Sequence, residues 1–153
     1  MSKIIHPVAG GIALLTIASF WLSTVLSELL ASEATVAAVK SAIPWGFLIL
    51  IPALAATGGS GFALAKGRRA GLVRAKAKRM PFIAANGILI LVPAALFLAY
   101  KASHGEFDVA FYGVQGLELV AGAVNITLLG LNMRDGLKMR KGRLLRTSQQ
   151  HAA

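Results

Sequence analysis

Glu118 is the residue of this chain whose position most suggests chemistry, because it is the only charged side chain within the apolar stretch 109–133. At helical spacing it shares one face with other polar or small residues, namely Gln115, Gly122, Asn125 and Asn132. A helix of this length spans a bilayer, where an ionised group facing lipid costs roughly 2.5 kcal/mol or more. We therefore expect this polar face to turn toward protein or water.

Three chemical roles and one structural role fit Glu118. It can carry a proton, bind an ion or contact a quinone, and burial would then keep the carboxyl partly neutral. Alternatively, it ties its helix to a hydroxyl or amide of a neighbouring helix. The sequence places no second acid or base at the same depth to complete a relay with Glu118. Glu118→Gln is expected to leave the fold intact and to alter activity.

Asn86 and Asn125 are the remaining amides inside predicted membrane spans that we single out. Amides in membranes commonly form hydrogen bonds between helices, worth about 1 kcal/mol each. We expect this structural role, within one chain or between subunits, in preference to ligand binding.

His6 is a candidate ligand for haem iron. Its position near the start of the first apolar block corresponds in depth to Met80 and Met133, which lie at the start of the third block and the end of the fourth. Imidazole and thioether form an axial pair for haem b, and helix bundles hold such cofactors between their helices. A two-fold dimer would instead supply a second His6. The simpler alternative is a histidine among lipid headgroups and two methionines that fill space.

Four long apolar blocks must position these residues. They predict spans at about 7–29, 42–64, 81–100 and 109–133, each long enough to cross a bilayer. In a chain of 153 residues they form one domain, 1–146, and the segment 134–153 is a basic tail. The prediction is an all-α integral membrane protein, an up-down four-helix transmembrane bundle.

The charges predict its orientation. Lys3, the loop after the second block and the tail hold fourteen of the sixteen basic residues, and only Lys40 and Lys101 flank the opposite ends. Positively charged loops stay in the cytoplasm, so both termini are predicted to be cytoplasmic, as in a bacterial inner membrane protein. The same residues are expected to contact anionic headgroups, and no nucleic-acid-binding module is recognisable.

Other motifs give little chemistry. The chain has no cysteine, which excludes disulfides, thiol catalysis and cysteine-held metal. The run TGGSG at 57–61 lacks the spacing of a phosphate loop and favours close helix contacts. His104, Glu106 and Asp108 could form a weak metal site, but their spacing favours a solvated acidic loop.

The layout resembles, in the number and length of its helices, the small b-type cytochromes of the inner membrane. Those proteins carry paired histidines that face each other, whereas only His6 of this chain lies near a helix. Three functions remain as predictions: electron transfer with haem b or quinone; a non-catalytic accessory or scaffold subunit that forms a homo-oligomer or docks on a partner; and a small oligomeric transporter or channel. No catalytic motif stands on its own.

Overall fold

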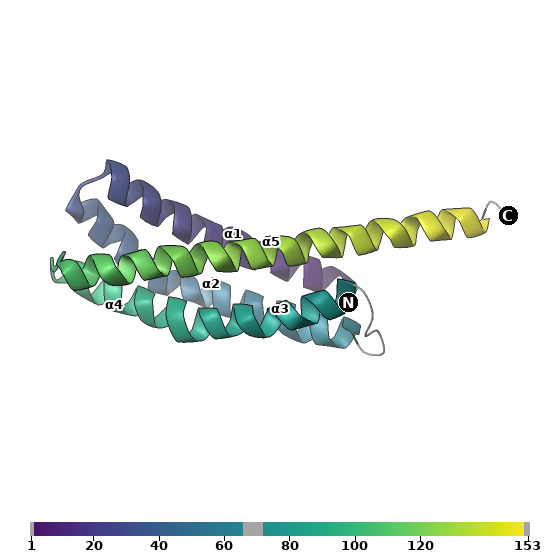
Figure 1. Cartoon of the computed structure of the whole chain (residues 1–153). Coiled ribbons are helices and arrows are strands. Elements are labelled where there is room, and N and C mark those ends of the chain that lie inside the picture. Colours follow the sequence, from purple (N-terminus) through teal and green to yellow (C-terminus); the bar gives the residue numbers. More distant parts are fainter. Residues whose placement is uncertain (1, 66–71, 152–153) are drawn as a thin grey trace.

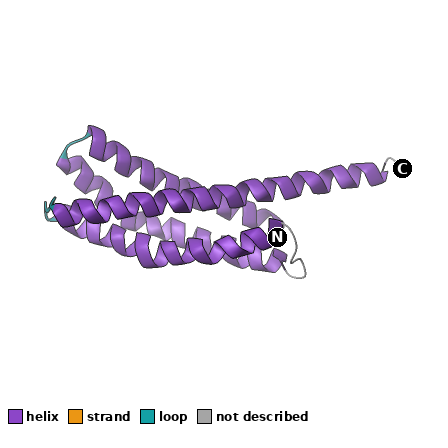
Figure 2. Cartoon of the chain, in the orientation of Figure 1, coloured by secondary structure: helices purple, strands orange, loops and turns teal. Residues whose placement is uncertain are grey.

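The protein is all-helical over the part described by the computed structural model, which covers the backbone of residues 2–65 and 72–151 and most side chains of 4–139 (Figures 1 and 2). The elements are α1 (Ser2–Leu30), α2 (Glu33–Ala65), α3 (Leu72–Asn86), the π-helical segment η1 (Gly87–Leu91), α4 (Val92–Ser103) and α5 (Val109–His151). Four helical stretches are long and apolar enough to cross a membrane, with α3, η1 and α4 forming the third. The prediction of an all-helical chain with four such helices is confirmed.

The helices extend beyond the predicted spans. The second span was predicted from 42, but α2 begins at Glu33, which places Lys40 about two turns inside the helix. The third crossing begins at Leu72 rather than 81, and α5 continues past 133 to His151. Hydropathy finds the apolar part of a helix, whereas backbone hydrogen bonding continues into flanking polar residues.

The η1 segment adapts the third crossing to Pro93. Proline has no N–H to donate, and its ring clashes with the carbonyl four residues earlier in a regular helix. A π-turn widens the helix at this point, and the N–H of Val92 donates to the carbonyl of Gly87. The crossing therefore continues through the proline without ending.

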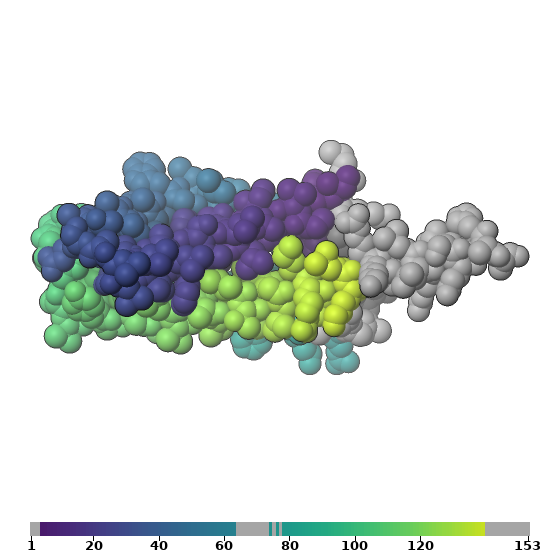
Figure 3. Space-filling view, turned by 90° about the horizontal axis from the view of Figure 1, so that it is seen from above, coloured from purple at the N-terminus to yellow at the C-terminus, as the bar shows by residue number. Residues whose placement is uncertain are grey.

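The helices run up and down, so that both chain ends lie at one end of the bundle (Figure 1). We call this the terminal end, and the opposite end, with the connections around Ser32 and 104–108, the distal end. Helix α1 packs against α2 and α5, and α4 packs against α2 and α5. Figure 3 shows α1 and α5 side by side on one face.

Two aromatic side chains of α1 pack closely against glycines of α2 and α5, and these contacts fix the position of α1. A Cβ added to Gly46 would overlap the ring of Phe20, and one added to Gly122 would lie 2.9 Å from Trp21. Only glycine lets the two aromatic rings lie this close to the backbones of α2 and α5. The main apolar core lies beside these contacts and comprises Ala13, Ile17, Leu50, Ala53, Ile83 and Leu129.

The distal turn between α4 and α5 is held by Lys101, whose ammonium donates to Glu106 at 2.8 Å and Asp108 at 2.7 Å. Gly105 adopts a φ of 69° there, a conformation that glycine takes without steric cost. Asp108 also caps α5 by accepting a hydrogen bond from the N–H of Phe111. The hydrogen bond from Lys101, followed by this cap, lowers the pKa of Asp108 below its ordinary 3.8.

Candidate functional site: an apolar cavity with a charged end

The polar face of α5 turns into the bundle, as predicted. Gln115, Asn125 and Asn132 are buried, with 4%, 1% and 4% of their surface exposed. The Glu118 side chain is 13% exposed. The face is therefore covered by the other helices, and each of its polar groups needs a partner within the protein.

Glu118 has a charged partner that the sequence reading missed. The Lys40 ammonium of α2 donates to Glu118 Oε2, and the Lys40 side chain is fully buried. Lys40 also donates to Thr24 Oγ1 of α1 at 3.4 Å. The expectation that no second acid or base lies at the depth of Glu118 is thus wrong.

The reason for this error lies in the start of α2. The sequence reading took Lys40 as a residue at the edge of an outer loop, because a 25-residue uncharged run follows it. The apolar residues ATVAAV at 34–39 precede Lys40, however, and were the available signal that the helix begins earlier. Because Glu118 lies 78 residues away in the chain, the pairing itself has no local signal.

An elongated cavity of about 580 Å³ lies between α2 and the third crossing and reaches this ion pair. Helix α2 packs against α4, but α3 and η1 stand away from it over the described residues. The opening between them is lined from Ile43 to Phe62 on α2, which corresponds to roughly 28 Å at 1.5 Å per residue. Thr24 and Glu118 line its distal end, and Phe62 and Met80 line its terminal end.

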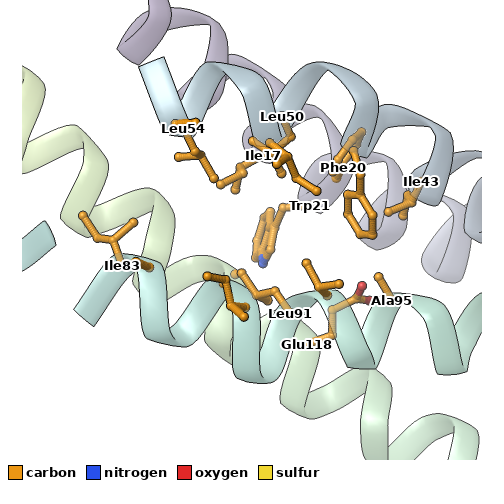
Figure 4. A pocket seen from close by; sticks show the side chains of 18 of the residues that line it. Ile17, Phe20, Trp21, Ile43, Leu50, Leu54, Ile83, Leu91, Ala95 and Glu118 are labelled. Atoms are coloured by element: carbon orange, nitrogen blue, oxygen red, sulfur yellow. The ribbon is translucent and has the colours of Figure 1, made fainter. Parts of the chain in front are cut away.

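The walls of the cavity are almost entirely apolar. Figure 4 shows the Trp21 ring projecting into the middle of the space, between Leu50 and Leu54 on one side and Leu91 on the other. The Trp21 N–H donates to the carbonyl of Leu119 at 2.9 Å, so only the faces of the ring remain for contact with a ligand. Among the described lining residues, Thr24 and Glu118 bring the hydroxyl and the carboxylate, both at the distal end.

Asn86 and Asn125 meet across the third crossing and α5. Asn86 Nδ2 donates to Asn125 Oδ1 at 2.9 Å and to the carbonyl of Ala121 at 2.8 Å. Asn125 Nδ2 in turn donates to the carbonyl of Ile83 at 3.4 Å. Neither amide lines the cavity, and their hydrogen bonds join α3 to α5.

His6 lies at the terminal end with partners on both ring nitrogens. Its Nδ1 lies 3.0 Å from the carbonyl of Thr57, which only accepts, so Nδ1 carries the proton. Nε2 is then the acceptor for the Lys76 ammonium, at 2.8 Å. Burial lowers the pKa of Lys76, and the charge of Asp135 opposes this effect.

The two methionines predicted as haem ligands have different surroundings. Met80 lines the cavity, and its sulfur accepts a hydrogen bond from Asn132 Nδ2 at 3.5 Å. Met133 is 46% exposed on the surface of α5, and His6 does not line the cavity. For His6 to bind haem iron through Nε2, Lys76 would have to leave, so this arrangement does not present the predicted ligand set to one haem.

Asp135 forms ion pairs with Arg79 and Arg134 at the terminal end. Arg79 donates to Asp135 Oδ2 at 2.7 Å and to Asn132 Oδ1 at 3.4 Å. Asp135 is 3% exposed, whereas the Arg79 side chain remains 26% exposed. The polar groups of this end therefore bind one another and keep contact with the surface.

Two predicted features remain, the possible metal site of the distal turn and the basic residues of the terminal end. At the distal turn, both carboxylates bind Lys101, His104 bonds to the carbonyl of Tyr100, and the described residues contain no group of three His, Asp or Glu residues placed to hold a metal. The basic residues Lys3, Lys66, Arg68 and Arg69 and the side chains of the tail beyond Met139 lie outside the described residues.

No protein family model, no curated protein and no solved structure matches this chain.

Proposed function

We propose that this protein binds an isoprenoid quinone, in its quinol form, in the cavity between α2 and the third crossing. The observation that carries the proposal is an apolar cavity of about 580 Å³ that ends at an ion-paired carboxylate. Ligand sites in proteins are commonly 300–1,000 Å³, mostly apolar, with a few polar groups that orient the ligand. A quinol has this same division into an apolar tail and a small polar head.

The shape of the cavity gives the ligand a direction. The long walls formed by α2, α3 and η1 accommodate the isoprenoid tail, because they offer only apolar contacts. The head then lies at Thr24 and Glu118, beside the ring of Trp21. Aromatic rings stack on one another favourably, by about 0.5–1.5 kcal/mol beyond the buried area.

Glu118 favours a ligand that donates hydrogen bonds. Its Oε2 is occupied by Lys40, and an ionised carboxylate only accepts. The hydroxyls of a quinol can donate to it, whereas the carbonyls of a quinone cannot. Glu118 is also the described carboxyl group that lines the cavity, so a proton leaving the ligand has an acceptor within reach.

A bound quinol supplies two electrons and two protons when it is oxidised. In this proposal, the chain holds the head and excludes water from the tail. Glu118 takes up the two protons one after the other and passes each to the distal surface, and a one-electron redox cofactor of a partner membrane subunit receives the two electrons in turn. The exposed apolar side chains of the helices are suited to contact lipid and such a subunit.

The basic charges support an orientation with the terminal end in the cytoplasm. Fourteen of sixteen Lys and Arg residues belong to that end or its flanking segments. The protein then lies in a bacterial inner membrane, its basic segments contact anionic headgroups, and the head site lies in the outer half of the membrane.

Quenching of Trp21 fluorescence tests the proposal. Quinone rings quench indole emission at contact, and Trp45, which is 74% exposed, can be removed as Trp45→Phe. In lipid nanodiscs, a ubiquinone analogue with an isoprenoid tail long enough to reach Gly58 would be titrated against this single-tryptophan protein, and its reduced form would then be added as a competitor. We expect saturable quenching by the quinone, and relief of that quenching at lower concentrations of the quinol.

Two neighbouring glycines of α2 provide a matched pair of variants. Gly58 lines the cavity and Gly59 lies on the exposed face, and a Cβ at either meets no atom within 4 Å. Gly58→Leu should weaken the quenching at least ~10-fold, since about 1.4 kcal/mol of lost contact suffices, and Gly59→Leu should not. Quenching that rises linearly with quinone and is equal in both variants would show partition into lipid only, and would refute the site.

The other predicted functions stay predictions. The positions of His6, Met80 and Met133 do not favour binding of one haem. Among the described residues, no specific contact favours transport or a purely structural role. An absorption spectrum of the purified protein checks the haem hypothesis directly.

A further inference from the structure

Two buried oxygen atoms near the distal end have no hydrogen-bond partner. These are Glu28 Oε1 on α1 and Gln115 Oε1 on α5. Gln115 is only 4% exposed, so water at the surface does not solvate its side chain. A buried acceptor without a donor costs about 1–3 kcal/mol, which makes two of them in one region an anomaly to be explained.

The helix register places these two residues at the same level of the bundle. Trp21 contacts Gly122 and bonds to the carbonyl of Leu119, which fixes the pairing of α1 with α5. Glu28 lies seven residues after Trp21, and Gln115 lies seven residues before Gly122. Because the two helices are antiparallel, both steps lead two turns toward the distal end and end at the same level.

One turn further into the bundle lies the charged end of the cavity. Thr24 is four residues before Glu28 on α1, and Glu118 is three residues after Gln115 on α5. Lys40 joins these two side chains by donating to both. The polar groups therefore form a continuous column from Glu28 and Gln115 to Glu118, bounded elsewhere by apolar helix faces.

Each of these buried acceptors requires a donor. An enclosed water molecule supplies one, and enclosed waters are elements from which proton-transfer paths are built. Unlike the polar groups of the terminal end, these oxygens are not satisfied by neighbouring side chains.

We propose that Glu28 and Gln115 form a proton path between the distal surface and Glu118. Glu28 takes up or releases the proton at the surface, a water molecule held by Gln115 passes it on, and Glu118 is the inner acceptor. This inference rests on the proposed function for its purpose, since a quinol held at Glu118 must release protons. The path itself is tested without quinone.

The charged groups around this column are few. Lys40 of α2 is paired with Glu118, and Glu33 at the start of α2 is exposed. On the third crossing, Lys101 is bound to Glu106 and Asp108 of the distal turn. Glu28 is thus the described carboxyl group that lies between the surface and the ion pair and has a buried, unpartnered oxygen.

The test uses Trp21 as a reporter of the charge on Glu118, because both side chains line the cavity and the Trp21 N–H bonds to the carbonyl of Leu119, the next residue after Glu118. Protein carrying Trp45→Phe in nanodiscs would be subjected to a rapid pH jump, and its emission followed in time. The variant Lys40→Met with Glu118→Gln removes both charges and should abolish the response, which assigns the signal.

Glu28→Leu is the critical variant, and Glu33→Leu is its exposed control. We expect Glu28→Leu to slow the emission change at least tenfold and to leave the final amplitude of the change unaltered. Glu33→Leu should give the same rate as the protein that carries only Trp45→Phe. Gln115→Leu should also slow it. Equal rates in all variants, or no pH response before substitution, would overturn the path.

The quinone and proton experiments can fail independently. A normal pH response with linear quinone quenching would refute the ligand and leave the path. Saturable quenching with unchanged kinetics in Glu28→Leu would refute the path and leave the ligand.

Discussion

The two ends of the bundle treat their buried polar groups differently. At the terminal end, His6 binds Lys76 and Thr57, and Arg79 binds Asp135. At the distal end, Lys40 and Glu118 form an ion pair that borders an apolar cavity, and two nearby oxygens have no partner. The polar groups just named at the terminal end bind one another, whereas the distal end has an ion pair beside a cavity and two oxygens without a described partner.

This difference supports the proposal that a ligand binds at the distal end. A saturated network fixes helices relative to one another but offers no free group to a ligand. An ion pair beside a cavity remains available on one side, and unpaired acceptors mark places where a proton or water is needed. The sequence suggested both Glu118 and His6 as chemical groups, and in the structure Glu118 lines the cavity whereas His6 does not.

The largest effect should follow from breaking the distal ion pair. Glu118→Gln leaves the fully buried Lys40 without a counter-charge, and removing one partner of a buried pair costs about 3–5 kcal/mol. This replaces the expectation, made before Lys40 was placed, that the substitution leaves the fold intact. Unfolding in mixed detergent micelles measures the change in the free energy of unfolding.

The double variant Lys40→Met with Glu118→Gln is its control. Removing both charges leaves no uncompensated ion, so most of the lost stability should return. If the double variant is as unstable as Glu118→Gln alone, the pair is not the source of the stability.

A smaller loss is expected from the amide contact in the middle of the bundle. Asn86→Leu removes the hydrogen bonds to Asn125 and Ala121 and should cost about 1 kcal/mol in the same assay. Thr127→Val is the control, since Thr127 is exposed and bonds only within its own helix. Equal losses in both variants would argue that the Asn86 contact contributes nothing specific.

At the terminal end, we expect a pH effect rather than a large loss. The pKa of Lys76 lies below its ordinary 10.5 in the fold because of burial. Between the folded pKa and 10.5 the unfolded chain binds a proton that the folded chain has lost, so stability should rise with pH in that window and level off above it. Thermal unfolding from neutral to alkaline pH measures this rise.

Lys76→Met should remove the rise, and Lys78→Met, a change at an exposed neighbour, should keep it. A rise that persists unchanged in Lys76→Met must come from another group.

The smallest effect should come from the exposed distal turn. The lowered pKa of Asp108 contributes stability above its ordinary 3.8, and this contribution is lost as pH falls through the folded value. Asp108→Asn removes the ion pair with Lys101 but keeps a good helix cap, so the melting temperature should fall less on acidification. Identical acid profiles in the two proteins would contradict this assignment.

The sequence alone determined the class of the molecule. Apolar stretches such as 109–133, in which Glu118 is the only charged residue, predict helices long enough to cross a membrane, because only internal hydrogen bonding satisfies the backbone there. The spacing of Gln115, Glu118 and Asn125 similarly determined which face of the last helix turns inward, since helical periodicity is a local property.

The tertiary structure decided what that face meets. Lys40 precedes an apolar block and reads as a boundary residue, yet an earlier helix start and the packing of α1, α2 and α5 bury it against Glu118. The cavity, likewise, exists because α3 and η1 stand away from α2. Contacts between residues 78 positions apart depend on how whole helices pack, and the composition of each helix leaves that packing open.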